Sequence, residues 1–251
     1  MKYLGVVSYC GNAYSGFERQ KDKKTIQGTL EKELSFLLGV PTFIKGAGRT
    51  DSKVNAEGQT FSFEAKPIEN VGRFLDALNR LLPRDIEMLR LEVVPDEFDA
   101  RHSSCGKRYR YRFSYGSKMP FETSTVAYIG NRNDFDEAAF LEAIRLYEGE
   151  HRFHNFTTKK DDKDDFVRFV HIESAWVDGK KRQGEVVFVA NGFMTYMVRF
   201  LVGAAFKAAF HTITISFLKE RIDSEERRIM SFKAPPEGLT LLEVLYHESY
   251  R

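Results

Sequence analysis

The stretch TIQGTLEKELSFLLGVPTFIKGAGRTDSKVNAEGQTFSFEA, residues 25–65, holds a helix, a glycine-rich turn and a strand in that order. Its first part, 25–39, opens on Thr25, a residue type that caps helices, and closes on Gly39, which favours a helix end. Apolar residues recur between them at helical spacing. They are Ile26, Leu30, Leu34, Leu37 and Leu38. The last part, 59–65, alternates polar and apolar residues, which predicts a half-buried strand.

The rest of the first hundred residues extends this order on both sides. Strands are predicted at 3–9, 42–46 and 86–94, and a helix at 71–82 that ends before Pro83. The order is therefore strand, helix, strand, strand, helix, strand, which is that of a split βαβ unit.

The second part of the chain repeats the order without a repeat of residues. Strands are predicted at 108–115, 166–177, 184–191 and 239–247, with 125–130 as a further partner for the first of them. Helices are predicted at 136–149 and from Gly192 onward. The sequence thus predicts an α/β fold of the α+β type, with two ferredoxin-like or RRM-like halves, 1–100 and 101–251. The face of such a sheet is a common platform for RNA.

Composition limits the class of protein. The chain has 251 residues, 42% of them hydrophobic, enough to bury a core. Only two cysteines are present, Cys10 and Cys105, and the N-terminus lacks a signal-peptide pattern, so we expect a cytoplasmic protein. The longest apolar run, 192–206, is too short for a membrane span and carries Arg199. With a net charge of +2, any polyanionic partner must be held by local patches.

Two charged residues interrupt the glycine-rich turn. Arg49 and Asp51 follow Gly46 and Gly48, which allow a sharp turn and the close approach of another molecule. Taken alone, such a sequence is most often an ordinary Asx-type turn.

Arg199 lies among Met197, Val198, Phe200 and Leu201 in a predicted helix. A cation in such surroundings is costly unless an anion meets it, although an arginine at a helix edge can also extend to solvent. A carboxylate paired with a buried arginine stays ionised at neutral pH, which suits a nucleophile or a base.

Residues 101–113 carry basic residues and no acidic one. The basic residues are Arg101, Lys107, Arg108, Arg110 and Arg112. In a strand, Tyr109, Tyr111 and Phe113 lie on the face opposite the last three arginines. Such interleaving suits single-stranded or looped RNA, because cations contact phosphates and rings stack on unpaired bases. The alternative is a basic strand whose aromatic face fills the core.

Other polar segments predict no chemistry. His151 and His154 lack a nearby third ligand, so we expect no metal site. Segment 157–166 reads as a solvated loop that can order on a partner, and 216–231 as short surface helices.

Taken together, these motifs resemble the tRNA pseudouridine synthase TruA family nearly end to end. The matching segments are Tyr9 to Gly16 (Y-x-G-x-x-Y-x-G), 25–34 (TIQGTLEKEL), 46–51 (GAGRTD), 100–113 (ARHSSCGKRYRYRF), 148–156 (EGEHRFHNF), 191–203 (NGFMTYMVRFLVG) and 235–244 (PPEGLTLLEV). Each motif is weak by itself, and seven in order make a specific match.

The resemblance implies roles for five residues. Asp51 falls on the catalytic aspartate, Arg49 on the arginine that draws the target nucleotide out of the stack, and Arg199 on the arginine that pairs with the aspartate. Tyr109 falls on the tyrosine that stacks against the target base, and Leu239 on the aliphatic residue that lines the pocket. Lys107, Arg108 and Arg110 are then expected to contact the RNA.

The resemblance also implies an architecture and a partner. It implies two ferredoxin-like halves around a central mixed, mostly antiparallel sheet, and a homodimer that grips tRNA without cofactor or metal. The implied reaction isomerises uridine to pseudouridine at positions 38–40 of the anticodon stem-loop.

Several positions depart from the family pattern. Ser52, Lys53, Val54 and Asn55 stand where the family usually has Ala-Gly-Val-His, Glu18 replaces a glutamine, and Arg152 replaces the aspartate of His-Asp-Phe. A divergent paralogue that modifies another RNA uridine is therefore an alternative. A non-catalytic RRM-like RNA-binding protein and a hydrolase with one aspartate are the rivals from other classes, and the sequence leaves open how Asp51 acts.

Overall fold

The computed structural model describes residues 1–158 and 166–247. By its internal contacts the chain forms two compact units, one made of Met1–Gly106 with the chain from Thr240 onward, the other of Lys107–Leu239. We call them unit 1 and unit 2. The sequence-based division into halves at residue 100 stays a prediction.

Unit 1 contains a mixed sheet and two helices. Its strands run in the order β4 (Ile86–Val94), β1 (Lys2–Tyr9), β3 (Asn55–Glu64) and β10 (Leu239–Tyr246). The first three pair antiparallel, whereas β10 runs parallel to β3, with Thr240 opposite Asn55. The short β2 (Lys45–Gly46) pairs with β3. The parallel pairing explains why a strand distant in sequence belongs to unit 1.

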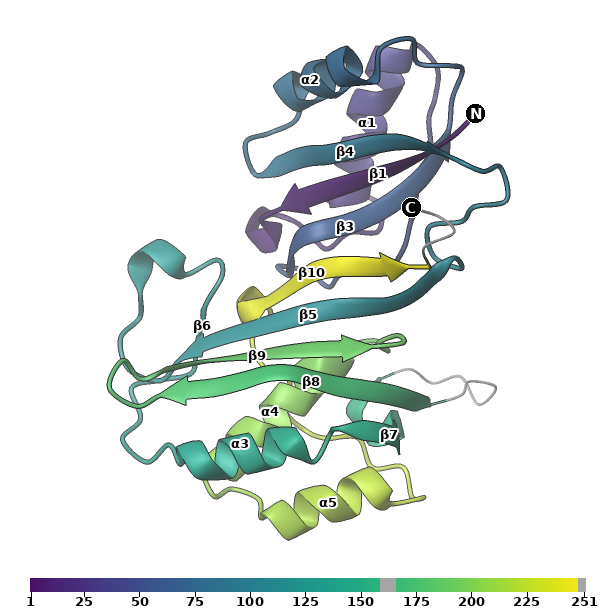
Figure 1. Cartoon of the computed structure of the whole chain (residues 1–251). Coiled ribbons are helices and arrows are strands. Elements are labelled where there is room, and N and C mark those ends of the chain that lie inside the picture. Colours follow the sequence, from purple (N-terminus) through teal and green to yellow (C-terminus); the bar gives the residue numbers. More distant parts are fainter. Residues whose placement is uncertain (159–165, 248–251) are drawn as a thin grey trace. The chain divides into compact units, whose positions relative to one another are not determined.

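The helices of unit 1 begin and end where the sequence predicts. In α1 (Ile26–Leu38) the Thr25 hydroxyl accepts a hydrogen bond from the Gly28 N–H at 3.2 Å, and Gly39 ends the helix with a φ of 69°. Asn70 caps α2 (Val71–Leu81) in the same way. Both helices contact each other and α2 packs on β4 (Figure 1).

Unit 2 contains an antiparallel sheet in the order β5 (Ser104–Ser114), β9 (Gln183–Ala190), β8 (Val167–Asp178) and β7 (Gly149–Arg152). The short β6 (Ala127–Tyr128) pairs with β5, which confirms the predicted partner of that strand. The first three residues of β5 belong to unit 1 by their contacts. The sequence did not predict β7, because four residues are too few for a visible alternation.

An aromatic core joins the sheet of unit 2 to its helices. The Phe113 ring lies 4.9 Å from Phe140 of α3 (Glu137–Arg145) and 4.9 Å from Phe206 of α4 (Met197–Ala209), between ring centroids. Tyr111 also contacts Phe206 edge to face. These two helices therefore cover the aromatic face of β5 (Figure 1). The arginines of that strand alternate with the aromatic residues and so lie on the other face.

The predicted helices of unit 2 differ in their bounds. The helix expected from Gly192 begins at Met197, because Tyr196 before it has a left-handed backbone with a φ of 62°. Within 216–231 only α5 (Ile215–Asp223) is helical. Most of the predicted loop at 157–166 lies outside the described residues.

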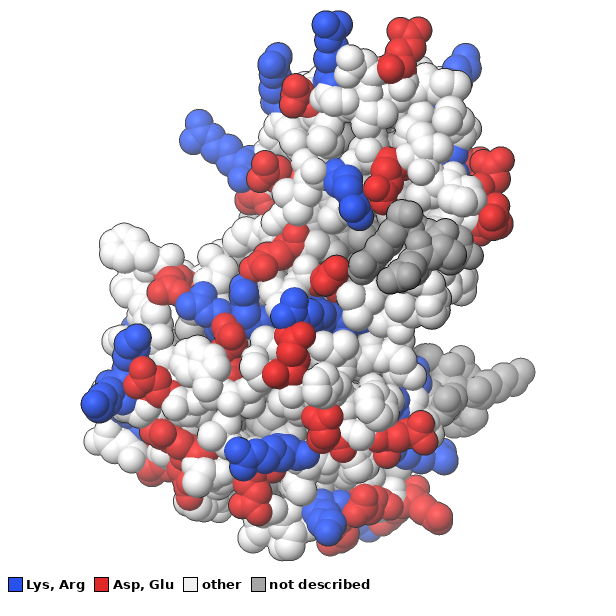
Figure 2. Space-filling view, viewed as in Figure 1, with Lys and Arg blue, Asp and Glu red and all other residues white. Residues whose placement is uncertain are grey.

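The fold class is confirmed: both units combine helices with a sheet whose strand pairs are mostly antiparallel. None of the described helices is long and apolar enough to cross a membrane. Acidic and basic side chains are interspersed over the face in Figure 2, in keeping with the small net charge.

Candidate active site

Asp51 lies in the turn between β2 and β3 of unit 1, and backbone hydrogen bonds fix that turn. The Thr50 carbonyl accepts from the Phe17 N–H at 3.1 Å, and the Asp51 carbonyl accepts from the Val54 N–H at 3.1 Å. Asp51 is half-buried in this turn. These bonds therefore hold the backbone of Asp51 in place.

Gly16 lets a second segment press against this turn. Its φ is +95°, and a Cβ there would lie 2.8 Å from the Thr50 carbonyl oxygen. A side chain would push the two segments apart, so glycine is needed at this position. Segment 14–17 thereby forms one side of the turn that carries Asp51.

The Thr50 side chain is held in place by a buried hydrogen bond with the Tyr9 hydroxyl. The Tyr9 hydroxyl lies 2.7 Å from the Thr50 hydroxyl, and both side chains are buried. Burial raises the pKa of Tyr9 well above its ordinary value, so this hydroxyl stays protonated. No local pattern predicts this contact, since Tyr9 and Thr50 lie 41 residues apart.

The departures from the family pattern have visible contacts in the structure. The Ser52 hydroxyl donates to the Tyr14 carbonyl at 3.2 Å, and the Asn55 side-chain oxygen accepts from the Gly11 N–H at 2.9 Å. Lys53 has a φ of 68°, in the left-handed region that favours the glycine usual there. These replacements keep the turn bound to segment 11–14.

Arg49 and Glu18 form an ion pair beside the turn. The Arg49 Nη2 lies 2.6 Å from the Glu18 Oε1, and the two side chains are 69% and 45% exposed. Arg49, which the resemblance expects to contact the target nucleotide, is thus paired with Glu18, the residue that replaces the usual glutamine.

In unit 2, Arg199 lies in the first turn of α4 and is fixed by segment 234–239. Its Nε donates to the Ala234 carbonyl at 2.8 Å, and its own carbonyl accepts from the Ala234 N–H at 2.8 Å. The guanidinium also lies over the Tyr196 ring, 5.5 Å from its centroid. Asp51 belongs to unit 1 and Arg199 to unit 2, and their pairing stays a prediction.

Segment 234–239 also carries Leu239. The Tyr111 hydroxyl donates to the Pro235 carbonyl at 2.8 Å, next to the carbonyl that Arg199 binds. A Cβ on Gly238 would lie 2.5 Å from the Arg112 carbonyl oxygen, so the segment lies directly on β5. Leu239 follows and is 6% exposed. The sequence did not indicate that Tyr111 positions this segment of the candidate site, although the PPEG motif lies within the segment.

Tyr109 lies on the buried face of β5 in unit 2. It is 8% exposed, and its ring meets Phe193 edge to face, with centroids 5.2 Å apart. The packing fixes the ring's orientation. Tyr111 and Phe113 on the same face fill the core, which agrees with the alternative interpretation for those two residues.

Each arginine on the other face of β5 has a carboxylate partner. Arg108 binds Glu173, Arg112 lies 2.8 Å from a Glu122 oxygen, and Arg110 lies 3.9 Å from a Glu185 oxygen. The neighbouring Lys107 is half-buried. A phosphate on this face would therefore exchange with a carboxylate, and phosphate contact by these residues stays a prediction.

The histidine motif is part of the core of unit 2. His154 and Asn155 are buried, and the Asn155 side chain donates to the Arg221 carbonyl at 2.9 Å. His151 contacts the Glu148 carbonyl through Nε2 at 2.9 Å. Over residues 1–158 and 166–247 no three His, Cys, Asp or Glu side chains are grouped so as to hold a metal ion.

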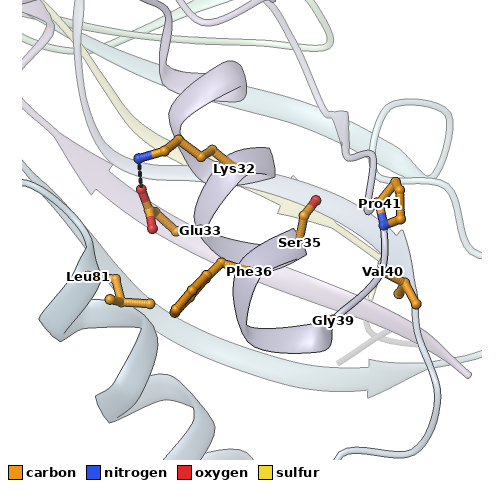
Figure 3. Close-up of a pocket in the computed structure, with 8 residues that line it drawn as sticks. All are labelled: Lys32, Glu33, Ser35, Phe36, Gly39, Val40, Pro41 and Leu81. Carbon is orange, nitrogen blue, oxygen red and sulfur yellow. Dashed lines mark hydrogen bonds and ion pairs between the residues drawn. The ribbon is translucent and has the colours of Figure 1, made fainter.

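An open depression on unit 1 contains none of the predicted site residues. It lies along α1 and the end of α2 and is lined mainly by apolar side chains, with Phe36 71% exposed (Figure 3). Its only ion pair in that view joins Lys32 and Glu33 at 2.8 Å.

Comparison with known proteins identifies relatives over the whole chain. A family model described as tRNA pseudouridine synthase matches residues 143–247. The tRNA pseudouridine synthase A of Lactococcus lactis subsp. lactis is 31% identical over 99% of this chain and 98% of its own. Those of Dictyoglomus turgidum and Anoxybacillus flavithermus are 32% and 33% identical, each over 96% of this chain and 97% and 96% of their own.

The names of these relatives agree with the family that the seven motifs resemble, and the fold class is consistent with it. The matches extend through both units, including the turn of Asp51 and the helix of Arg199. The chain belongs to the tRNA pseudouridine synthase A, or TruA, family, whose members isomerise uridine in tRNA.

Proposed function

We propose that the chain converts uridine to pseudouridine at positions 38–40 of the tRNA anticodon stem-loop, with Asp51 as the nucleophile. The reaction breaks the bond from C1′ to N1 of uridine and joins the same uracil through C5. The N1 position gains a proton and C5 loses one, so the product is an isomer. No electrons are gained or lost, and one carboxylate in a tight pocket suffices.

One observation carries this proposal: Asp51 is half-buried in a turn that hydrogen bonds and the close contact of Gly16 hold in place. Catalysis by a single group depends on such positioning, because a nucleophile held in line with the reacting carbon avoids the entropic cost of orientation. An ordinary surface turn would not need a second segment packed on it.

The other site residues have roles that fit their surroundings. The target base leaves the RNA stack, Arg49 contacts the opened backbone, and Tyr109 and Leu239 contact the base. Arg199 pairs with Asp51 and keeps it ionised. The firm anchoring of Arg199 by Ala234 supports a fixed direction for the guanidinium.

The test is a product analysis on unmodified tRNA transcripts with wild type and Asp51→Asn, a change that keeps the shape and removes the charge. Pseudouridine is mapped by chemical labelling and primer extension. We expect pseudouridine at positions 38–40 with wild type only, and unchanged RNA binding by the variant. Substantial turnover by Asp51→Asn would refute the role of Asp51.

The same map separates the alternatives. Pseudouridine elsewhere in the RNA would indicate the divergent paralogue, unchanged RNA the binding protein, and cleaved RNA the hydrolase.

The family resemblance also supports a cytoplasmic homodimer as part of the proposal. Light scattering on the purified protein tests the dimer, and a single-chain mass would contradict it.

A further inference from the structure

Glu18 is bound to Arg49, a cation of the turn that carries Asp51. In the Arg49–Glu18 pair the nitrogen and oxygen lie 2.6 Å apart. Arg49 precedes Asp51 by two residues, so the charge of Arg49 is neutralised within the turn that carries the proposed nucleophile. The inference that follows rests on the proposed function, because it concerns how RNA gains access to this arginine.

The backbone of unit 1 keeps Glu18 beside Arg49. Glu18 follows Phe17, whose N–H binds the Thr50 carbonyl, and Thr50 follows Arg49 in the chain. Segment 14–17 is further joined to the turn by the contact of Gly16 and the bond from the Lys53 N–H to the Tyr14 carbonyl at 3.3 Å. The carboxylate is therefore presented to Arg49 by a fixed framework, and only the two side chains need to move for the pair to open.

The pair is exposed enough to open at small cost. The Arg49 side chain is 69% exposed and that of Glu18 45%, and ion pairs in such positions are screened by water. A carboxylate and a phosphodiester both fit the planar guanidinium through two oxygens. An RNA phosphate can therefore take the place of the carboxylate, and Glu18 then faces solvent close to the phosphate.

We propose that Glu18 restrains access to Arg49, which it occupies until a phosphate of a correctly docked RNA displaces it. RNA that binds elsewhere on the protein through general charge does not reach Arg49, since displacement requires a phosphate at the turn itself. Glu18 thus lowers the affinity for RNA that places a phosphate at the turn, by the cost of opening the pair, and has little effect on RNA bound elsewhere. The glutamine usual at this position in the family cannot neutralise the arginine.

The charge of Glu18 is removed with the least change of shape by Glu18→Gln. We expect KM for the tRNA substrate and Kd for a non-substrate RNA hairpin of equal length to fall, by about two- to fivefold for an exposed pair of this kind. The decrease should be smaller for the hairpin, which places no phosphate at the turn, so the ratio of the hairpin Kd to the tRNA KM rises. The value of kcat should stay within about twofold, because an exposed pair contributes little once the substrate is docked.

Salt dependence gives a second readout that a purely structural role would not change. In wild type, displacement of Glu18 leaves a carboxylate that takes up a counterion, which offsets one released from the RNA. In Glu18→Gln that offset is absent, so the plot of log Kd against log salt concentration should steepen by roughly one phosphate contact. Glu18→Asp keeps the charge and should restore the wild-type slope.

The matched control is Glu64→Gln, which changes the net charge equally. Glu64 ends β3, where its side chain is 80% exposed and pairs with Lys2 at 4.0 Å. We expect Glu64→Gln to change neither the ratio of the hairpin Kd to the tRNA KM nor the slope of log Kd against log salt concentration. The double variant Glu18→Gln with Arg49→Gln, compared with Arg49→Gln alone, tests whether Glu18 acts through Arg49. In binding measurements, Glu18→Gln should have no further effect on Kd once Arg49 has been replaced.

The outcomes are distinguishable from failure of the proposed function. If wild type forms pseudouridine but Glu18→Gln changes neither KM nor the salt slope, the role of Glu18 is wrong while the function stands. An equal effect of Glu64→Gln, or an undiminished effect of Glu18→Gln without Arg49, would mean general repulsion of RNA and also overturns it. If wild type forms no pseudouridine, the function fails, and the binding measurements still decide whether Glu18 restrains Arg49.

Discussion

Arg199 and Ala234 bind each other through two hydrogen bonds of 2.8 Å, one from the arginine Nε to the alanine carbonyl and one from the alanine N–H to the arginine carbonyl. The first bond uses the donor nearest to the chain, which leaves the two terminal nitrogens at the outer end of the guanidinium. Segment 234–239 thereby determines where the charge of Arg199 points within unit 2.

Arg199→Lys tests this arrangement. Lysine keeps the positive charge but has no nitrogen at the Nε position, so the bond to Ala234 is lost and the charge is no longer held in one direction. We expect the free energy of unfolding to fall by about 1 kcal/mol and kcat/KM to fall at least about tenfold. Denaturant unfolding and single-turnover kinetics measure the two effects. Arg145→Lys, on the exposed surface of α3, is the control and should change neither; wild-type activity in Arg199→Lys would contradict the positioning role.

Tyr109 is examined by two replacements with different consequences. Phenylalanine keeps the ring that packs on Phe193, whereas alanine leaves a cavity at a site that is 8% exposed. We expect Tyr109→Phe to retain stability within about 1 kcal/mol and Tyr109→Ala to lose about 3 kcal/mol. If the ring also contacts the target base, kcat/KM should fall more in Tyr109→Ala than in Tyr109→Phe. Equal losses of activity in both would mean that the hydroxyl, and not the ring, matters.

Lys53 has a left-handed backbone with a φ of 68°, a conformation in which a side chain with a Cβ is strained. We expect Lys53→Gly to raise the free energy of unfolding by about 0.5 to 1 kcal/mol, as the strain relieved exceeds the added entropy of the unfolded chain. Lys53→Ala removes the charge without relieving the strain and should not stabilise. Chemical denaturation of the three proteins at one pH measures the difference, and equal gains in both variants would assign the effect to charge.

We expect His154 to lower the free energy of unfolding as the pH falls into the acid range. Burial lowers the pKa of His154 below its ordinary value of 6.5, and the nearby Arg152 and Arg227 act in the same direction against two backbone hydrogen bonds. As pH falls through 6.5 the unfolded chain takes up the proton before the folded one, so stability decreases from there down to the folded pKa. Above pH 6.5 the group contributes no pH dependence.

Denaturation midpoints of wild type and His154→Gln between pH 7.5 and 5 test this prediction. The decrease toward acid should be smaller in His154→Gln, whatever its stability at pH 7.5. The exposed His247→Gln serves as the control and should follow wild type. A parallel decrease in wild type and His154→Gln would show that other groups cause the acid sensitivity.

Local signals in the sequence predict many of the elements because each depends on near neighbours. The helix over 26–38 follows from its cap at Thr25, its apolar spacing and its stop at Gly39, all within one segment. The basic strand follows from alternation in the same way, and the burial of its aromatic face agrees with the alternative interpretation of that strand. The predicted start of α4 is too early because residues 192–196 are mostly apolar and yet end in a left-handed Tyr196.

Contacts between distant segments could not be predicted from such signals. The carboxylate partners of Arg108 and Arg112 come from β8 and the 3-10 turn at 120–122, and alternation in β5 says nothing about them. The same holds for Tyr9 with Thr50 and for Tyr111 with Pro235. Each is a hydrogen bond or ion pair whose partners are chosen by packing.

The sequence by itself determined the family, the type of fold and the identity of the candidate nucleophile, because these are carried by contiguous motifs and by periodicities of two and 3.6 residues. Only the tertiary structure decided that β10 pairs with β3, that Arg199 is oriented by Ala234, and that Arg49 is occupied by Glu18. These relationships join residues far apart in the chain, and their free energy comes from burial and charge pairing that exist only once the chain has folded.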